Sequence, residues 1–389
     1  MLMDFNLTKE QLDIQKAARE FAKGEFDPEL VLEYDRDQQF PIALWKKASE
    51  FGFTGVHYPE EFGGQGLGLF ENALIVEAFC RQDSGMGIAL ALSDFGSELI
   101  VAHGNRDQKK KVLPAAAQGK ALLTVGLLED GYALAPFKTF AREEAHGYVL
   151  QGQKSFVTLG NLAENIVLVC QTGLEDPTAQ SLFLLQREMV GLESRSMGET
   201  LGMRMVPVSR MSLNSLLAPR DHLIAKKDQG YSLIRDFLNS MRIECGAMAV
   251  GLAQGALDQA LDYSKRREQF GRTIATFDLV KNKLADMLMG VEMARLVVYK
   301  GALSLDRGKP DDRVILMSKA IGVKTACEVT NHGVQILGGY GYMTEGQMEH
   351  FFRDAKALDL FVESGQAARD IVVEQAVGRD RGVGHACPE

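Results

Sequence analysis

Hydrophobic spacing changes twice along the 389-residue chain, and these two changes constrain the fold more than any other feature. Residues 4 to about 122 carry apolar side chains at the spacing of helices. From about residue 123, short and partly alternating apolar segments are separated by Gly, Asn, Asp and Pro, as expected of antiparallel strands. Helical spacing returns at about residue 231. The sequence therefore predicts a multidomain α+β protein.

The predicted units are an N-terminal helical domain (1–122), a middle antiparallel β-domain (123–230), a C-terminal helical bundle (231–379) and a flexible tail (380–389). Thr8 and Gln11 stand three residues apart before the first apolar run and predict a capping box at a helix start. In the C-terminal part, one apolar stripe at helical spacing consists of Val280, Leu284, Met287, Leu288 and Val291. These patterns predict a fold class but no function.

Composition and charge limit the classes of partner. Hydrophobic residues make up 46% of the chain and charged residues 24%, which is ordinary for a globular protein. The net charge of −9 argues against nucleic-acid binding, because phosphate recognition needs a positive surface. The N-terminus lacks the basic start and apolar core of a signal peptide, and no apolar run approaches the roughly 20 residues of a membrane span. We therefore expect a soluble protein that binds no nucleic acid.

Cysteine and histidine positions bear on metals and on the redox compartment. The five cysteines are far apart in the chain, at Cys80, Cys170, Cys245, Cys327 and Cys387. No CxxC pair or Cys/His cluster has the spacing of metal ligands, so no metal site is predicted. Free thiols indicate a reducing compartment and hence the cytoplasm. His57, His103 and His350 have no cysteine or carboxylate at catalytic spacing and are interpreted as structural.

Two motifs in the last third carry a family resemblance. Residues 335–356 read QILGGYGYMTEGQMEHFFRDAK, and residues 265–272 read KRREQFGR. Both resemble signatures of the acyl-CoA dehydrogenase flavoproteins, namely a Gln-x-x-Gly-Gly-x-Gly run before a helix with Arg-Asp-Ala-Arg/Lys, and an Arg followed by Phe-Gly. Further matches to the family are LTKEQ near the start, YPEEFGG at 58–64, GYVLQGQKSFVTLG at 147–160 and LGMR at 201–204. The matches occur in family order over residues 4–379, so the resemblance is specific.

The resemblance implies the acyl-CoA dehydrogenase fold, in which a helical domain, a β-domain and a four-helix bundle follow one another. It also implies FAD as the cofactor and an acyl-coenzyme A thioester as the substrate. In that reaction a proton leaves the carbon alpha to the thioester, a hydride passes from the beta carbon to flavin N5, and an electron-transfer flavoprotein takes the electrons. The expected assembly is a homotetramer, or a heterotetramer with a paralogue.

Residues that match FAD contacts of the family, position by position, are Thr158, Arg267, Phe270, Gln335, Gly338, Gly339, Ser364 and Gln366. The guanidinium of Arg267 can bind a pyrophosphate through two parallel hydrogen bonds. The glycine pair allows a close approach of backbone and cofactor. In the family, the residues matching Arg267 and Phe270 face a flavin held by the neighbouring subunit. Phe156 stands where relatives have a Trp beside the flavin ring.

The turn after the second motif departs from the family pattern. Most relatives read Tyr-Glu-Gly-Thr-x-Gln there, and the Glu is the catalytic base; aligned without gaps, Val362 takes its place. Val362 keeps the backbone N–H that in the family helps to polarise the thioester carbonyl, so stabilisation of an enolate can survive without the base. Some relatives carry the base immediately before an Arg on a later helix, where this chain has Met241 before Arg242. Arg242 and Val362 are expected to contact the substrate.

Three other carboxylates are candidates for the base. Glu363 is adjacent to the lost position, but a shift of one residue re-aims a side chain. Glu244 lies three residues after Met241 and hence on nearly the same helix face. Asp94 lies in a segment that lines the acyl cavity in the family, where partial desolvation would raise its pKa toward that of a useful base. Asp94 is the first choice, with a solvated Asp94/Glu98 stripe as the structural alternative.

Two further departures affect the expected cofactor and coenzyme A contacts. Residues 127–136 read LLEDGYALAP, where most relatives read Thr-Glu-Pro-x-Ala-Gly-Ser-Asp. Only Glu129 clearly matches, and Leu128 lacks the hydroxyl group of the family's threonine. Asp278 stands where many relatives have a Gln near FAD.

Three functions follow from this pattern. The first is oxidation of an atypical acyl-CoA, cyclic or unsaturated, such as a cyclohexene-carbonyl-CoA, with a relocated base. The second is an enoyl-CoA reductase, which needs a proton donor instead of a strong base. The third is a non-catalytic subunit of a heteromeric dehydrogenase, because residues that face a neighbour's flavin are kept while the chain's own base is lost.

Overall fold

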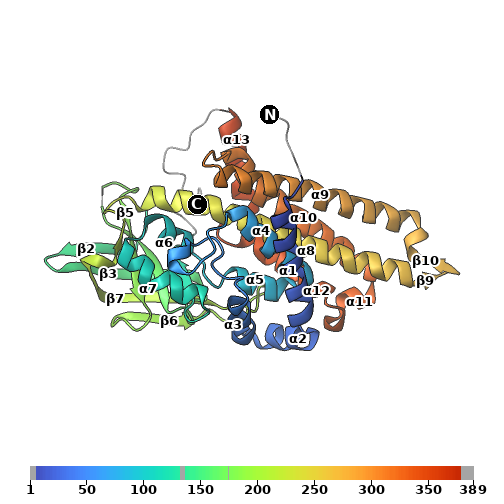
Figure 1. Cartoon of the computed structure of the whole chain (residues 1–389), viewed down its shortest axis with the longest axis horizontal. Coiled ribbons are helices and arrows are strands. Elements are labelled where there is room, and N and C mark those ends of the chain that lie inside the picture. Colours follow the sequence, from blue (N-terminus) through green and yellow to red (C-terminus); the bar gives the residue numbers. More distant parts are fainter. Residues whose placement is uncertain (1–5, 132–135, 174, 378–389) are drawn as a thin grey trace.

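The computed structural model describes residues 6–131, 136–173 and 175–377 (Figure 1). The predicted tail lies outside these ranges. The N-terminal part is helical, with the helices α1 (Lys9–Glu25), α2 (Pro28–Asp37), α3 (Ile42–Glu50), α4 (Leu69–Gln82), α5 (Ser84–Ala91), α6 (Ser97–His103) and α7 (Arg106–Ala117), and one 3₁₀ turn, η1 (Glu60–Phe62). The predicted capping box is confirmed, because Thr8 and Gln11 exchange backbone-to-side-chain hydrogen bonds of 3.0 and 3.2 Å.

Helix α4 is the centre of the N-terminal part. Almost all its side chains from Phe70 to Cys80 are buried, since α1 packs on one side and α8 on the other. An aromatic cluster fills the space beside it, with ring centroids of Phe21, Phe53 and Phe79 5.1–5.7 Å apart. Such apolar burial is the main stabilising contribution in a domain of this size.

The middle part is a β-sheet. Its strands are β1 (Leu123–Gly126), β2 (Phe140–Glu144), β3 (Gly147–Thr158), β4 (Asn165–Gln171), β5 (Gln180–Gln186), β6 (Leu192–Ser196), β7 (Val208–Pro219) and β8 (Leu223–Ile224). A 3₁₀ turn, η2 (Arg220–His222), connects β7 with β8. The strand order is β6-β7-β3-β2-β4-β5-β8, and β1 pairs with β4. The prediction of an antiparallel domain needs a correction, because β1–β4 and β2–β4 pair in parallel. These strands are not joined by hairpins, so the connecting chain is long enough for parallel pairing.

The C-terminal part is a helical bundle. Its elements are α8 (Gly230–Arg266), β9 (Glu268–Gln269), β10 (Arg272–Thr273), η3 (Ile274–Thr276), α9 (Asp278–Asp306), α10 (Asp312–Leu337), α11 (Gly339–Tyr342), η4 (Thr344–Gly346), α12 (Met348–Leu360) and α13 (Gly365–Val377). Helices α8, α9, α10 and α12 pack on one another, and α13 packs on α10. With 37 residues, α8 is roughly 55 Å long. It runs from the β-sheet to the β9–β10 hairpin at the opposite end of the molecule (Figure 1).

The predicted stripe on α9 is only partly buried. Leu284, Met287 and Val291 face the core, whereas Leu288 is 44% exposed. Leu288 follows Met287 directly, and a step of 100° around the helix turns it outward. Elsewhere, the observed elements begin close to the predicted domain limits, with β1 at Leu123 and α8 at Gly230. The division of the chain into domains at residues 122 and 230 stays a prediction.

A buried polar network joins the three parts. Asp354 of α12 accepts hydrogen bonds from Ser84 Oγ (2.7 Å) and from the N–H of Met203 (2.6 Å). His350 lies between Asp35, at 3.2 Å, and Asp83, at 3.4 Å. Although burial lowers its pKa, the surrounding carboxylates Asp354 and Asp83 raise the pKa of His350 well above its usual value. Asp35 and Asp83 are distant from His350 in the chain, so its sequence spacing did not reveal them as partners.

Among the described residues, no helix has the length and apolar character that crossing a membrane requires.

Candidate active site

A cleft of about 310 Å³ opens between the β-sheet and the end of α12. Its lining is mostly apolar and includes Phe95, Val125, Leu128, Met203 and Val208. Predicted site residues stand on two of its walls, Thr158 on β3 and Val362 after α12. An apolar cleft with a few polar groups is the usual form of a small-molecule site.

The wall formed by β3 is shaped by a β-bulge. The register of β3 against β7 shifts between Lys154 and Val157, and Phe156 has a φ of 54°. A bulge re-aims the side chains that follow it. As a result Phe156 is 39% exposed and lines the cleft together with Thr158, which is buried. The structure therefore brings Phe156, Thr158 and Leu128 together in the lining of the cleft.

The opposite wall of the cleft is the turn that contains Val362, the residue aligned with the family's catalytic Glu. Helix α12 ends at Leu360, and Val362 has a φ of 63°. Positive φ is uncommon for any residue other than glycine and unfavourable for a β-branched one. No carboxylate occupies residue 362, so only its isopropyl group and its backbone can contact a ligand there.

Glu363, the nearest predicted base, is held in an ion pair. Arg242 donates from Nε to Glu363 Oε1 at 2.7 Å and from Nη2 to Oε2 at 2.9 Å. Arg242 also donates from Nη1 to Asn239 Oδ1 at 2.7 Å. Neither Arg242 nor Glu363 is among the residues that line the cleft. This pairing satisfies the carboxylate and turns it away from the role of a free base.

The other two candidate bases lie together. Asp94, Glu98 and Glu244 form a carboxylate cluster between the N-terminal helices and α8. Asp94 Oδ2 accepts from Tyr58 Oη at 2.5 Å, and Glu244 Oε1 accepts from Asn72 Nδ2 at 3.0 Å. The sequence placed Glu98 only on a solvated stripe with Asp94, as the structural alternative to a base. The spacing of four residues between Asp94 and Glu98 was the signal in the sequence that both could belong to one carboxylate cluster.

Burial controls the protonation of this carboxylate cluster. Burial raises the pKa of Glu244 well above its usual value, and the neighbouring Glu98 and Asp94 raise it further. Burial also raises the pKa of Glu98, which hydrogen-bonds to Glu244. Two buried carboxyl groups in contact hold a shared proton, because both cannot ionise side by side. Asp94 accepts hydrogen bonds from the hydroxyl groups of Tyr58 and Ser97.

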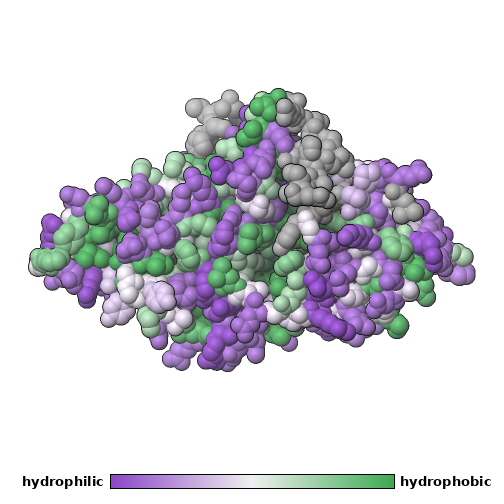
Figure 2. All heavy atoms as spheres, turned by 180° about the vertical axis from the view of Figure 1, so that it is seen from behind, coloured by the Kyte–Doolittle hydropathy of each residue, from purple (hydrophilic) through white to green (hydrophobic). Residues whose placement is uncertain are grey.

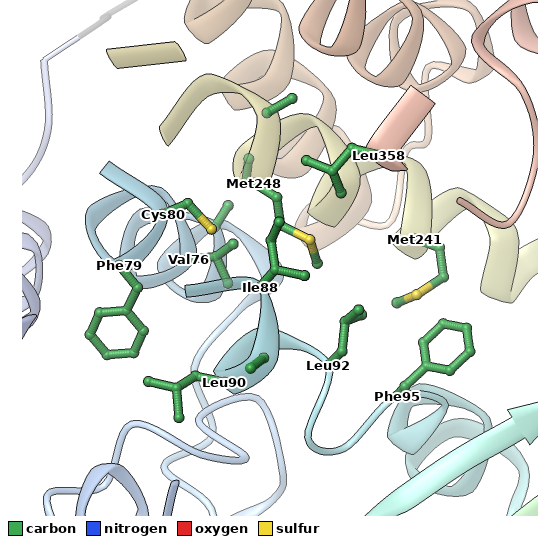
Figure 3. Packing of buried hydrophobic residues seen from close by; sticks show 14 of the residues in the cluster. Val76, Phe79, Cys80, Ile88, Leu90, Leu92, Phe95, Met241, Met248 and Leu358 are labelled. Atoms are coloured by element: carbon green, nitrogen blue, oxygen red, sulfur yellow. The ribbon is translucent and has the colours of Figure 1, made fainter. Parts of the chain in front are cut away.

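Phe95 connects this cluster with the cleft. Its ring lies 5.6 Å from Phe361 and 5.5 Å from Phe237, between ring centroids. Figure 3 shows Phe95 beside Met241 of α8. Asp94 precedes Phe95 but is not among the cleft residues; it lines a separate enclosed cavity of about 20 Å³, which suffices for one water molecule.

His57, which the sequence analysis interpreted as structural, lies beside this carboxylate cluster. Its Nε2 lies 3.1 Å from Ser97 Oγ and 4.0 Å from Glu98 Oε1. The sequence shows no carboxylate at catalytic spacing from His57, whereas the fold brings Glu98 close to it. Its partners are 40 or more residues away in the chain, so sequence spacing contains no signal for the contact.

The remaining predicted FAD contacts lie far from this cleft. Arg267 and Phe270 belong to the β9–β10 hairpin and are exposed, Phe270 to 94%. The helical rise places Arg267 roughly 37 Å along α8 from Arg242, which lies beside the Val362 turn. Figure 2 shows hydrophobic surface at this end of the molecule, on the left. These residues cannot reach the cleft of their own chain.

The glycine pair has open space above it. Gly338 has a φ of 61° and a ψ of −130°, a region that glycine alone readily adopts. A Cβ atom added at Gly338 or Gly339 would meet no atom within 4 Å. Gln335 is exposed nearby on α10. A dinucleotide shared between two chains fits this arrangement, with a ring in the cleft of one and an arginine, an aromatic ring and a glycine pair from the other.

Ser364 and Gln366 make local contacts instead of lining the cleft. Ser364 Oγ accepts from the N–H of Ala367 at 3.1 Å and caps α13, and Gln366 donates to Asp370 at 2.8 Å. Their contact with FAD stays a prediction. Glu129 is structural, because it accepts from buried Lys154 at 2.9 Å; although burial raises its pKa, Lys154 lowers it overall.

Sequence comparisons identify the family to which the chain is similar. Three acyl-CoA dehydrogenase family profiles match in order, for the N-terminal domain (8–120), the middle domain (129–216) and the C-terminal domain (228–376). The probable acyl-CoA dehydrogenase fadE25 of Mycobacterium bovis is 33% identical over 382 residues, covering 96% of this chain and 97% of that protein. The acryloyl-CoA reductase (NADH) of Anaerotignum propionicum is 31% identical and covers 97% of each.

Solved structures show the same fold. Butyryl-CoA dehydrogenase from Megasphaera elsdenii superimposes with a TM-score of 0.92 at 28% identity, covering 96% of this chain and 100% of that one. FAD complexes are found among the other similar structures. The profiles together span most of the chain, and the cleft lies where its three parts meet. The chain therefore belongs to the acyl-CoA dehydrogenase family of flavoprotein oxidoreductases.

Proposed function

We propose that this protein oxidises an acyl-coenzyme A thioester with FAD, and that its base comes from the carboxylate cluster instead of from residue 362. The observation that carries the proposal is the pairing of Glu363 with Arg242, while Asp94 stands next to the cleft residue Phe95. Of the three candidate bases, Asp94 is favoured and Glu363 is least favoured.

The parts of the site have separate roles. Bound FAD supplies the hydride acceptor. Thr158 and Phe156 hold one side of the ring, and Val362 offers its N–H to the thioester carbonyl. Asp94 takes the substrate proton after its side chain turns from Tyr58 toward the cleft. Tyr58 and Ser97 hydrogen-bond to Asp94 beforehand, and the Glu98–Glu244 pair keeps its own proton.

The substrate is an acyl-CoA with an apolar acyl group. Its proton leaves from a carbon that a base at residue 362 would not reach. The leucine, valine and phenylalanine side chains of the cleft support an apolar acyl group. A base displaced from residue 362 suits a cyclic or unsaturated substrate such as a cyclohexene-carbonyl-CoA. Arg242 is occupied by Glu363, so a direct contact with coenzyme A would require this ion pair to open.

The second candidate is reduction of an enoyl-CoA. The raised pKa of Glu244 favours a protonated carboxyl group, which is what a reductase needs as a proton donor. The relative from Anaerotignum propionicum is named an acryloyl-CoA reductase. A third candidate is a non-catalytic subunit, which the exposed Arg267 and Phe270 would also fit.

Assembly and partners follow from the exposed surfaces. Apolar side chains on the outer face of α9 are 44–60% exposed, namely Leu288, Met289, Met293 and Leu296. With the β9–β10 hairpin they form a surface for other chains, in a homotetramer or a heterotetramer with a paralogue. An electron-transfer flavoprotein is the proposed electron acceptor. The free cysteines Cys80, Cys170, Cys245 and Cys327 support a cytoplasmic location.

Flavin spectroscopy tests these candidates. The purified protein is expected to hold one FAD per chain, and the oxidised flavin band should bleach anaerobically when cyclohexene-carbonyl-CoA or a saturated acyl-CoA is added. Reoxidation of a chemically reduced flavin by an enoyl-CoA, without bleaching by any acyl-CoA, would favour the reductase instead. A chain that retains FAD only with a paralogue would favour the subunit role.

A further inference from the structure

The turn after α12 holds Val362 in a conformation that needs outside support. The N–H of Glu363 donates to the carbonyl of Phe361 at 2.8 Å, which closes a three-residue turn around Val362 at a φ of 63°. Turns of this type are rare and strained, and they persist only where neighbouring contacts hold them. Contacts to the residues on either side of Val362 are therefore of interest.

The cationic side chains of Arg242 and Lys319, which belong to different helices, both hydrogen-bond to this turn. Arg242 of α8 binds the carboxylate of Glu363 through two hydrogen bonds of 2.7 and 2.9 Å, and both side chains are about nine-tenths buried (12% and 11% exposed). Lys319 of α10, which is 1% exposed, donates from Nζ to the backbone carbonyls of Phe361 and Glu363. We call Arg242, Glu363 and Lys319 the clamp. Lys319 therefore holds the peptide group between Phe361 and Val362, which carries the Val362 N–H, and Arg242 holds the side chain of the next residue.

The clamp leaves one donor free beside the cleft. In the described ranges 6–131, 136–173 and 175–377, no group accepts a hydrogen bond from the N–H of Val362. Val362 itself lines the cleft, whereas Arg242, Glu363 and Lys319 do not. A buried or half-buried N–H without a partner costs free energy, so a ligand acceptor at this point would bind favourably.

We propose that Arg242, Glu363 and Lys319 are positioning residues that hold the Val362 N–H toward the cleft, where it donates to the carbonyl oxygen of a bound thioester. Glu363 then acts as the anion of the clamp and not as a base. The inference rests on the proposed function, because it takes a coenzyme A thioester as the ligand. This chain thus keeps the backbone donor of the turn and holds it with the clamp, while residue 362 carries no acidic side chain.

Carbonyl polarisation gives a readout that activity alone does not. The absorbance of dimethylaminocinnamoyl-CoA shifts to longer wavelength when a hydrogen bond polarises its thioester carbonyl. The wild-type holoenzyme should shift it, and Glu363→Ala and Arg242→Gln should lose at least about half of the shift, with kcat lowered about tenfold and KM changed less. The exchange of charges in Arg242→Glu/Glu363→Arg should restore part of the shift. Lys16→Gln, in an exposed ion pair on α1, is the matched control.

Three outcomes would overturn the inference. The first is a full spectral shift in Glu363→Ala together with about a hundredfold slower flavin reduction, which would identify Glu363 as the base. The second is a wild-type holoenzyme that binds the probe without a shift, and the third is one that does not bind it. Thermal melting of each variant separates a lost clamp from misfolding. Failure of the proposed function would appear separately, as a wild-type chain without FAD or with flavin that no thioester bleaches.

Discussion

Two acidic side chains close to the same cleft, Glu363 and Glu244, lie in opposite electrostatic surroundings. Glu363 is bound by a guanidinium through two hydrogen bonds. Glu244 is bound by the amide of Asn72 and by a second carboxyl group, Glu98. The first arrangement places a cation beside the carboxylate, and the second stabilises a proton on Glu244. A residue type therefore indicates little about acid–base chemistry until its partners are known.

The difference extends to the regions around them. The turn at Val362 is held by cations and presents a backbone donor, whereas the carboxylate cluster accepts hydrogen bonds from the neutral donors Asn72, Tyr58 and Ser97. In the proposed function, proton transfer belongs to the second region and carbonyl binding to the first. This division is the basis of the predictions that follow.

The largest effect is expected at Asp94. Asp94→Asn removes the proposed base and keeps the side-chain volume, so the rate of flavin reduction by an acyl-CoA should fall by about a hundredfold or more. Stopped-flow absorbance at the flavin band measures this rate. Glu363→Gln serves as the comparison and should lose much less. A larger loss in Glu363→Gln than in Asp94→Asn would reverse the assignment of the two regions.

A smaller effect is expected at the opposite end of the molecule. Arg267→Gln removes charge-assisted hydrogen bonds to a pyrophosphate, which are worth about 1.5–3 kcal/mol, so FAD affinity should fall roughly 10- to 100-fold. Because Arg267 is exposed, the melting temperature of the FAD-free protein should stay nearly unchanged. FAD retained per chain after gel filtration measures the change. Unchanged retention would exclude this hairpin from the cofactor site.

The pH dependence of stability tests whether Glu244 keeps its proton in the folded state. Since its folded pKa is raised, Glu244 keeps its proton in the folded state after it would ionise in the unfolded state. The contribution of Glu244 to the free energy of unfolding therefore falls as the pH rises above the ordinary pKa of about 4.5, by about 1.4 kcal/mol per pH unit until the raised pKa is reached. Glu244→Gln cannot ionise and should remove this slope.

Urea unfolding at several pH values measures the slope for wild type and variant. Glu20→Gln, whose residue is 71% exposed on α1, is the matched control and should keep the wild-type slope. Equal slopes for wild type and Glu244→Gln would show that Glu244 ionises normally, and the proton-sharing pair would then be rejected.

The smallest effect concerns backbone strain at Val362. Val362→Gly removes the penalty for a β-branched residue at a φ of 63°, which is about 1–2 kcal/mol, and is opposed by the larger entropy of the unfolded glycine. A net gain of about 1 kcal/mol or less is expected in the free energy of unfolding, measured by urea titration. A clear destabilisation would mean that the isopropyl contacts outweigh the strain.

Local patterns in the sequence determined the order of the architecture. The capping box at Thr8 and Gln11 and the change from helical to alternating spacing near residue 123 depend on neighbours within a few positions, and both appear in the structure. The family motifs likewise marked Thr158 and Val362 as cleft residues. Such signals are readable because helix and strand periodicity is local.

Only the tertiary structure decided which charges meet. Arg242 and Glu363 are 121 residues apart, and Asn72 and Glu244 are 172 apart. Their contacts depend on how α4, α8 and the turn after α12 pack together, which no local spacing encodes. The partners set each group's protonation through burial and neighbouring charge, so the chemistry of the site followed from packing, while the succession of helices and strands followed from the sequence itself.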